Sequence, residues 1–438
     1  MLLRLLPRKL KSIFMAESKI WEFNKGEWSE AYVFLKLLAE GRIYGADSKE
    51  EKNLSTYIDI LNLLKFEKNK TFKFVRTGEG SDCLITAYEN DDKFIVKTAP
   101  ELEKKASRLY YAIKNTKPTG KRKTFSVQEL QDFLQDFRFT SPKVPSIPKD
   151  KQILYGKKSD IVITMRDSID KAVSMEGFSI KSRLGSNPTL FNSAIASALV
   201  YEVEDCTDEI MHAINALDEF SGKMIPALRD TYDLKLRFVG SQPVNGVQIF
   251  ARNVMFVDTQ MLRILSVLML IQTGYLTEAC SMSKDLAREL AYFNPLDFPD
   301  PESFYAAKLK DFHFAAFSGM TASEAWDGKR KLSGGYIDVD RNGDLLYYRA
   351  ISDDIFCTYL FDHLYFDRPD RGYKKDIAVA TAKAFKEGRE LTAEELHDLT
   401  YTMKDGKEVH RSPKGDWGYI YKQDGKYLLN INFQTRFR

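Results

Sequence analysis

The fold of this chain is decided by KKSDIVITMRDS at residues 157–168 and GFSIKSR at residues 177–183. The first stretch contains an Ile-Val-Ile run, and consecutive β-branched residues of this kind are typical of a buried strand. The second stretch predicts a neighbouring strand. Together the two strands would place Asp160, at the start of one, and Lys181, on the other, at one edge of a sheet.

An aspartate and a lysine at one sheet edge are groups that a metal-dependent phosphodiesterase needs. Mg²⁺ is a hard cation that takes oxygen ligands, and when bound it lowers the pKa of a water molecule and neutralises charge on phosphate. Lys181 would orient that water or stabilise the pentavalent phosphorane. The same pattern also fits an ordinary strand-end carboxylate at Asp160 and an exposed strand lysine, because such pairs occur by chance in long chains.

The composition is that of a folded protein with a sizeable core. Of the 438 residues, 44% are apolar and 13% aromatic, more than a disordered chain contains. The 65 Lys and Arg and 62 Asp and Glu leave a formal charge of +3, which does not decide whether nucleic acid is a partner. Four cysteines without metal-clip or redox spacing predict buried thiols in a reducing, cytoplasmic location. We expect no signal peptide at the N-terminus, and the most apolar interior stretch, 262–275, is too short for a membrane span.

Periodicity and turn residues predict a mixed α+β fold. We expect short strands at residues 72–78, 83–89 and 93–99, and hairpins with Asn-Gly and Asp-Gly turns at 336–349 and 417–433. Expected helices are 29–41 with Ser29 as N-cap, 54–64, 126–137 with Ser126 as N-cap, 188–203, 208–230, 256–293 and 376–399.

Two longer runs carry a family resemblance. They are NKGEWSEAYVFLKLLAEG at residues 24–41 and GFSIKSRLGSNPTLFN at residues 177–192. With the strand between them, they resemble the HpaII-type restriction endonucleases of the wider PD-(D/E)XK nuclease group, and the similarity extends from about residue 21 to the C-terminal FQTRF. The resemblance implies a nuclease core sheet flanked by helices, Mg²⁺ as cofactor, and hydrolysis of double-stranded DNA at a short site, CCGG, that leaves a 5′-phosphate.

The resemblance also implies roles for particular residues. Asp160 matches the metal-binding aspartate of the nuclease motif and Lys181 matches its lysine. Ser179 stands where many members have Asp or Glu, and a serine hydroxyl is a poor Mg²⁺ ligand. Glu30 on the first helix is our first candidate to replace the missing carboxylate, and Glu176 is the second. Without the resemblance, Glu30 reads equally well as a solvated charge on the first helix.

We expect the chain to be organised around the Pro- and Lys-rich segment 141–151, a stiff basic connector. The expected parts are an N-terminal extension at 1–20, a DNA-contacting part at 21–140, the connector, a nuclease core at 152–260 and an α/β recognition part at 261–438. The partners implied are double-stranded DNA and a cognate methyltransferase that protects the host genome. A monomer and a homodimer both remain open.

Basic loops supply candidate DNA contacts. The runs KPTGKRK at 117–123 and GKRKLSGG at 328–335 are flexible and cationic, and such loops meet backbone phosphates. Each alone also fits a solvated surface turn. The candidate DNA-binding residues are Lys121, Arg122, Lys123, Lys157, Lys158, Arg183, Asn187, Lys329 and Arg330. If they act together, cations gather on one face of the protein while most carboxylates face elsewhere.

Other interpretations fit parts of the sequence. Ser179 also fits a DNA-binding protein of the same fold that has lost catalysis, and an RNA-directed nuclease is a third possibility. The DVDRNGD run at 338–344 imitates a calcium loop, but its twelfth position is Arg349 rather than the required Glu, so we expect a hairpin turn. The five histidines are scattered and predict no zinc site.

Overall fold

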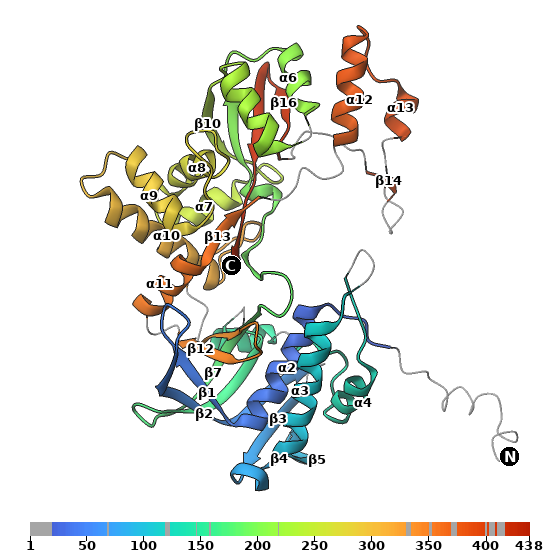
Figure 1. Cartoon of the computed structure of the whole chain (residues 1–438), viewed down its shortest axis with the longest axis vertical. Coiled ribbons are helices and arrows are strands. Elements are labelled where there is room, and N and C mark those ends of the chain that lie inside the picture. The colour runs from blue at the N-terminus through green and yellow to red at the C-terminus, as the bar shows by residue number, and fades with distance from the viewer. Residues whose placement is uncertain are drawn as a thin grey trace, which may run out of the picture. The chain divides into compact units, whose positions relative to one another are not determined.

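The structure is a computed structural model that divides into two compact units (Figure 1). Unit 1 consists of residues 1–46, 52–186 and 333–348, and unit 2 consists of residues 47–51, 187–332 and 349–438. The described residues are 20–67, 70–118, 123–145, 147–156, 159–217, 219–329, 334–349, 353–368, 375–398, 401–402, 408–409 and 417–438. The expected nuclease core at 152–260 spans the division between residues 186 and 187.

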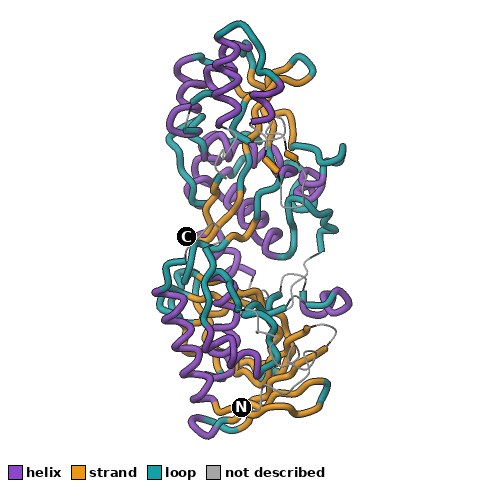
Figure 2. The backbone as a smooth tube through the Cα atoms, turned by 90° about the vertical axis from the view of Figure 1, so that its right-hand side faces the viewer, coloured by secondary structure: helices purple, strands orange, loops and turns teal. Residues whose placement is uncertain are grey.

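Both units mix helices and strands, as Figure 2 shows, so the α+β class is confirmed. The described residues contain no helix with the length and apolarity that a membrane crossing demands. The four cysteines are free, but only Cys83 is buried. The expectation of buried thiols is therefore wrong for Cys206, Cys280 and Cys357, which are half-buried.

Unit 1 is built on a nine-stranded sheet in the order β1-β12-β11-β7-β6-β2-β3-β4-β5. Strand β1 also pairs with β2. Six strands, β1, β12, β11, β7, β6 and β2, are therefore hydrogen-bonded in a closed ring. The two strands predicted around Asp160 and Lys181 are β6 and β7, and they are adjacent and antiparallel. The bounds are β1 Arg42–Ala46, β2 Lys52–Glu67, β3 Lys70–Thr77, β4 Leu84–Glu89, β5 Asp92–Thr98, β6 Ile161–Asp167, β7 Val173–Ser182, β11 Gly335–Val339 and β12 Leu345–Arg349.

The predicted strands at 72–78, 83–89 and 93–99 are confirmed as β3, β4 and β5, whereas the helix expected at 54–64 is wrong. This segment lies in β2, whose residues pair in turn with β1, β6 and β3. Its leucines imitate helical spacing, but Ile58 and Ile60 alternate with half-buried neighbours as a strand requires. Pairing on both edges outweighs a local pattern.

The helices of unit 1 are α2 Lys25–Glu40, α3 Ala99–Asn115, α4 Gln128–Asp136 and α5 Gln152–Tyr155. Helix α2 begins earlier than expected: Asn24 is its N-cap and forms a capping box with Glu27, while Ser29 lies buried inside the helix. Ser126 does not cap α4 either, because Val127 occupies that position. Figure 1 shows α2 and α3 side by side, and α2 contributes Trp28 and Phe34 to one core with the strands.

Unit 2 contains smaller sheets, ordered β10-β9-β17-β16, β13-β18-β8 and β14-β15. Its strands are β8 Thr189–Phe191, β9 Leu199–Val203, β10 Leu236–Ser241, β13 Leu364–Asp367, β14 Tyr401–Thr402, β15 Glu408–Val409, β16 Ile420–Gln423, β17 Lys426–Ile431 and β18 Gln434–Phe437. Its α-helices are α6 Asp208–Asn215, α7 Ile249–Met255, α8 Met261–Gln272, α9 Ser283–Phe293, α10 Pro301–Phe317, α11 Asp353–His363, α12 Lys375–Lys386 and α13 Ala393–Asp398.

The helix expected at 188–203 is wrong, because this segment forms β8, a short 3-10 turn and β9. Strand β9 pairs with β10 on one side and with β17, more than 200 residues away, on the other. The helices expected at 208–230, 256–293 and 376–399 exist, but each is broken into shorter pieces.

Both predicted hairpin turns are present. Asp424 and Gly425 have φ of +52° and +76°, as a tight β16–β17 turn requires. In the β11–β12 turn, one oxygen of Asp340 accepts the backbone N–H groups of Asn342 and Asp344, each at 2.8 Å. The run at 338–344 is therefore a hairpin turn, as expected.

Gly177 on β7 is a position where only glycine fits. A Cβ atom here would overlap the carbonyl oxygen of Tyr155 and lie 2.5 Å from the hydroxyl oxygen of Ser159. We expect Gly177→Ala to lower the free energy of unfolding by roughly 1–3 kcal/mol, the usual cost of overpacking. Urea unfolding measures this loss, and an unchanged midpoint would contradict the close approach of the two segments.

We expect the buried contact between Ser283 and His313 to make the stability of the protein depend on pH in the acidic range. Ser283 Oγ donates to the carbonyl oxygen of Leu364 at 2.9 Å, so His313 Nε2 donates to Ser283 at 2.8 Å. Burial lowers the pKa of His313 from 6.5 to about 3. Between these values the unfolded state binds more protons, so this contribution to stability is complete above pH 6.5 and falls as the pH is lowered, by about 1.4 kcal/mol per unit.

We expect His313→Phe to reduce that slope, because phenylalanine does not titrate. Chemical unfolding of the wild type and the variant at several pH values between 3 and 7 measures the two slopes. Equal slopes would show that His313 is not held neutral in the folded state.

Candidate active site

Asp160 is held at the entrance to β6 by the neighbouring strand. Its backbone N–H donates to the carbonyl oxygen of Phe178 at 2.8 Å. Its carboxylate oxygen Oδ2 accepts the backbone N–H of Ile180 at 2.7 Å and the hydroxyl of Ser179 at 3.2 Å. Ser179 thus orients the aspartate.

Glu30 lies on α2, and its carboxylate interacts electrostatically with Asp160. Its Oε2 accepts the backbone N–H of Val144 at 2.8 Å. The pKa of Glu30 is raised to about 8, chiefly by burial and next by the charge of Asp160. The Val144 amide, Lys143 and Lys181 act in the opposite direction. The structure therefore brings Glu30, Asp160 and Lys181 into one electrostatic neighbourhood.

Lys181 lies near the end of β7, half-buried, on the same face of the strand as Ser179 because strand side chains alternate. Glu176 is an odd number of positions away and therefore points to the other face. Its Oε1 accepts the hydroxyl of Ser174 at 2.8 Å. Of the two carboxylates expected to compensate for Ser179, the geometry favours Glu30.

The donor set fits a hard divalent cation. Asp160 and Glu30 each use one carboxylate oxygen for protein hydrogen bonds, and among the described residues neither Asp160 Oδ1 nor Glu30 Oε1 accepts one. Within the described ranges, no three side chains of the metal-ligating types come together. Mg²⁺ often binds through one or two carboxylates while keeping waters and taking phosphate oxygens, so a pair of carboxylates is sufficient.

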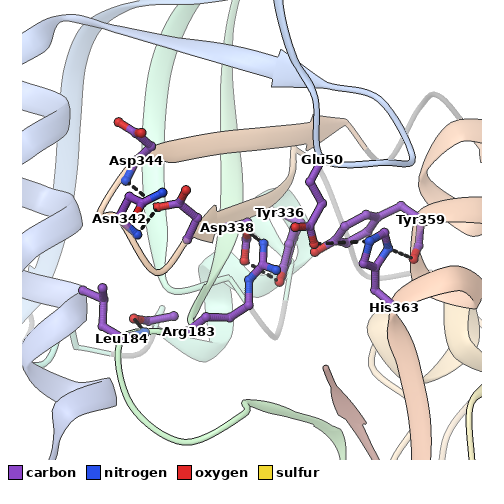
Figure 3. Close-up of polar contacts among 11 residues, drawn as sticks. Glu50, Arg183, Leu184, Tyr336, Asp338, Asn342, Asp344, Tyr359 and His363 are labelled. Carbon is purple, nitrogen blue, oxygen red and sulfur yellow. Dashed lines mark hydrogen bonds and ion pairs between the residues drawn. The ribbon is translucent and has the colours of Figure 1, made fainter. Parts of the chain in front are cut away.

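The candidate DNA-binding residues differ in their exposure and in their contacts. Arg183 forms an ion pair with buried Asp338, as Figure 3 shows, and its side chain is 11% exposed. Lys123 and Lys329 are exposed, and the backbone carbonyl of Asn187 accepts the guanidinium of Arg436 at 2.8 Å. The remaining candidates, Lys121, Arg122, Lys157, Lys158 and Arg330, lie outside the described residues, as do residues 1–19.

Sequence reasoning missed two contacts of the candidate site. The backbone amide of Val144 anchors Glu30, whereas the segment 141–151 was expected to be a stiff basic connector. Asp338 lies beside Lys181 because β11 runs parallel to β7 with these two residues in register. Neither contact has a sequence signature, since each joins positions more than 100 residues apart.

A separate pocket of about 700 Å³ lies at the other end of β6, where Arg166 lines it. Its charged lining residues balance, and Arg42 is already paired with Asp59 at 2.7 Å. This pocket therefore has no excess of positive charge. The charged residues that line it are Glu40, Arg42, Lys52, Asp59, Arg76, Glu79, Arg166 and Asp344.

Comparison with known proteins shows the family to which the chain belongs. The family model for the HpaII restriction endonuclease matches residues 24–376. The Type II restriction enzyme HpaII of Haemophilus parainfluenzae is 28% identical over 416 residues, which cover 94% of this chain and 98% of that enzyme. No solved structure matches the chain.

The protein is thus a site-specific endonuclease that binds double-stranded DNA. It belongs to the HpaII restriction endonuclease family.

Proposed function

We propose that this endonuclease hydrolyses phosphodiester bonds of double-stranded DNA with Mg²⁺, at CCGG, and leaves a 5′-phosphate. The observation that carries the proposal is that Glu30 interacts electrostatically with both Asp160 and Lys181, which lie at the same end of the paired strands β6 and β7. The arrangement of strands β6 and β7 supports a core of the PD-(D/E)XK type. The CCGG target follows from the resemblance to HpaII-type enzymes.

The residues have distinct tasks in this proposal. Asp160 and Glu30 would hold the ion, and Ser179 fixes the orientation of Asp160 through its 3.2 Å hydrogen bond. Bound Mg²⁺ would lower the pKa of a water molecule and neutralise charge on the scissile phosphate. Lys181 orients the attacking water or stabilises charge on the phosphate oxygens.

The same proposal includes the cellular setting. An active enzyme of this kind would cut an unprotected genome, so we propose a cognate methyltransferase as its genetic partner. Cytoplasmic location follows from a substrate that is the cell's own or invading DNA. A homodimer is a further proposal, because a palindromic site presents the same half-site twice.

A plasmid digest tests the function. Purified protein is incubated with plasmid DNA in Mg²⁺ or in EDTA, and the cut ends are sequenced. We expect discrete fragments ending at CCGG only with Mg²⁺, and no cutting of plasmid methylated at these sites. Cutting at another sequence would overturn the CCGG assignment, and a gel shift without cleavage would overturn the catalytic assignment.

A further inference from the structure

A buried ion pair lies next to Lys181 on the neighbouring strand. Strand β11 runs parallel to β7, and their register places Asp338 opposite Lys181. Asp338 is fully buried, forms an ion pair with Arg183, and accepts a hydrogen bond from the hydroxyl of Tyr336 at 3.3 Å. Figure 3 shows the ion pair between Arg183 and Asp338.

Arg183 is tied to β11 by its backbone as well as its side chain. Its backbone N–H donates to the carbonyl oxygen of Val339 at 2.9 Å. A carboxylate taken out of water requires a partner, and loss of one partner leaves an uncompensated charge. The pair therefore joins the end of β7 firmly to β11.

Lys181 lies between two fixed points. On one side the backbone N–H of Ile180 donates to Asp160 at 2.7 Å, and on the other Arg183 is held by Asp338. The backbone around Lys181 is thus fixed relative to the candidate metal-binding aspartate and to β11. A shift of this short segment would move the ammonium group directly.

We propose that Arg183 and Asp338 are positioning residues that hold Lys181 in place for catalysis, and that Arg183 does not act as a DNA contact. This inference rests on the proposed function of Lys181. It assigns to Arg183 a role different from the phosphate contact expected from sequence, and it gives Asp338 a role that the motif alone does not supply.

The test uses the full-length protein and four variants: Arg183→Met, Arg183→Lys, Asp338→Asn, and the double variant Arg183→Met with Asp338→Asn. Each is assayed for single-turnover cleavage, for DNA affinity at several salt concentrations, and for thermal stability. The control is Arg108→Met, which removes an exposed arginine that pairs with Glu129 on the surface of unit 1.

We expect Arg183→Met and Asp338→Asn to lower the cleavage rate by about 10²-fold, the usual effect of misplacing a catalytic group, with unchanged DNA affinity. The double variant removes both buried charges, so it should regain thermal stability but stay slow. Arg183→Lys keeps the charge and should recover part of the rate. If a single variant does not fold, the double variant and Arg183→Lys still decide the question.

Two results would overturn the inference. A double variant that regains the normal cleavage rate would show a purely structural pair. Weaker DNA binding by Arg183→Met with a salt slope reduced by about one would show a phosphate contact instead. Neither result would contradict the proposed function. That function is contradicted by a different result, namely that the wild-type protein does not cut DNA with Mg²⁺.

Discussion

Lys181→Ala is expected to lower the rate of DNA cleavage by at least about 10²-fold, the size of effect seen when one group that stabilises a charged transition state is removed. DNA binding should stay largely intact, because one ammonium group contributes little to an interface with many phosphate contacts. The variant should also fold normally, since Lys181 is half-buried and not part of the apolar core.

Cleavage and gel-shift assays on the same preparation measure both effects. Lys73→Ala is a suitable control, because Lys73 is an exposed lysine on β3 of the same sheet. If the Lys181 variant cuts at the normal rate, the assignment of the site is wrong. If it loses binding and cleavage to the same extent, Lys181 is a DNA contact rather than a catalytic group.

Glu30→Gln is expected to stabilise the protein and to abolish DNA cleavage. The pKa of Glu30 is raised to about 8 in the folded protein, chiefly by burial and next by Asp160. The folded state therefore holds a proton that the unfolded state has lost between pH 4.5 and about 8. The contribution of Glu30 to stability is complete below pH 4.5. It falls as the pH rises from 4.5 through about 8, by up to roughly 5 kcal/mol in total.

Glutamine stays neutral, so the variant should lose this pH dependence and unfold at higher urea concentration than the wild type at pH 8. Cleavage should be abolished, because an amide oxygen is a weaker Mg²⁺ ligand than a carboxylate. Glu22→Gln, at an exposed position, is the control. An active variant, or one with unchanged stability at pH 8, would remove Glu30 from the site.

The raised pKa of Glu30 also ties metal binding to pH. A carboxylate must lose its proton before it binds a cation, so Mg²⁺ affinity should rise as the pH approaches 8. This dependence has the opposite direction to that of stability. If Glu30 binds Mg²⁺ as proposed, cleavage should rise over the same pH range in which the contribution of Glu30 to stability falls.

The sequence by itself determined the parts of the site that depend on local pattern. The Ile-Val-Ile run identified β6, the alternation in GFSIKSR identified β7, and the apolar stripe of residues 29–41 identified most of α2. Strands and amphipathic helices leave such signals because burial on one face repeats with a fixed period. The local pattern therefore predicted that Asp160 and Lys181 lie at the same end of two neighbouring strands, whereas their roles at a site were implied by the family resemblance.

Only the tertiary structure decided the features that depend on distant partners. The segments 54–64 and 188–203 look helical in isolation but become strands because they pair with segments far along the chain. The choice of Glu30 over Glu176 depends on which face of β7 points toward Asp160. The pairing of Arg183 with Asp338 depends on the register of two parallel strands, which a single sequence does not encode locally.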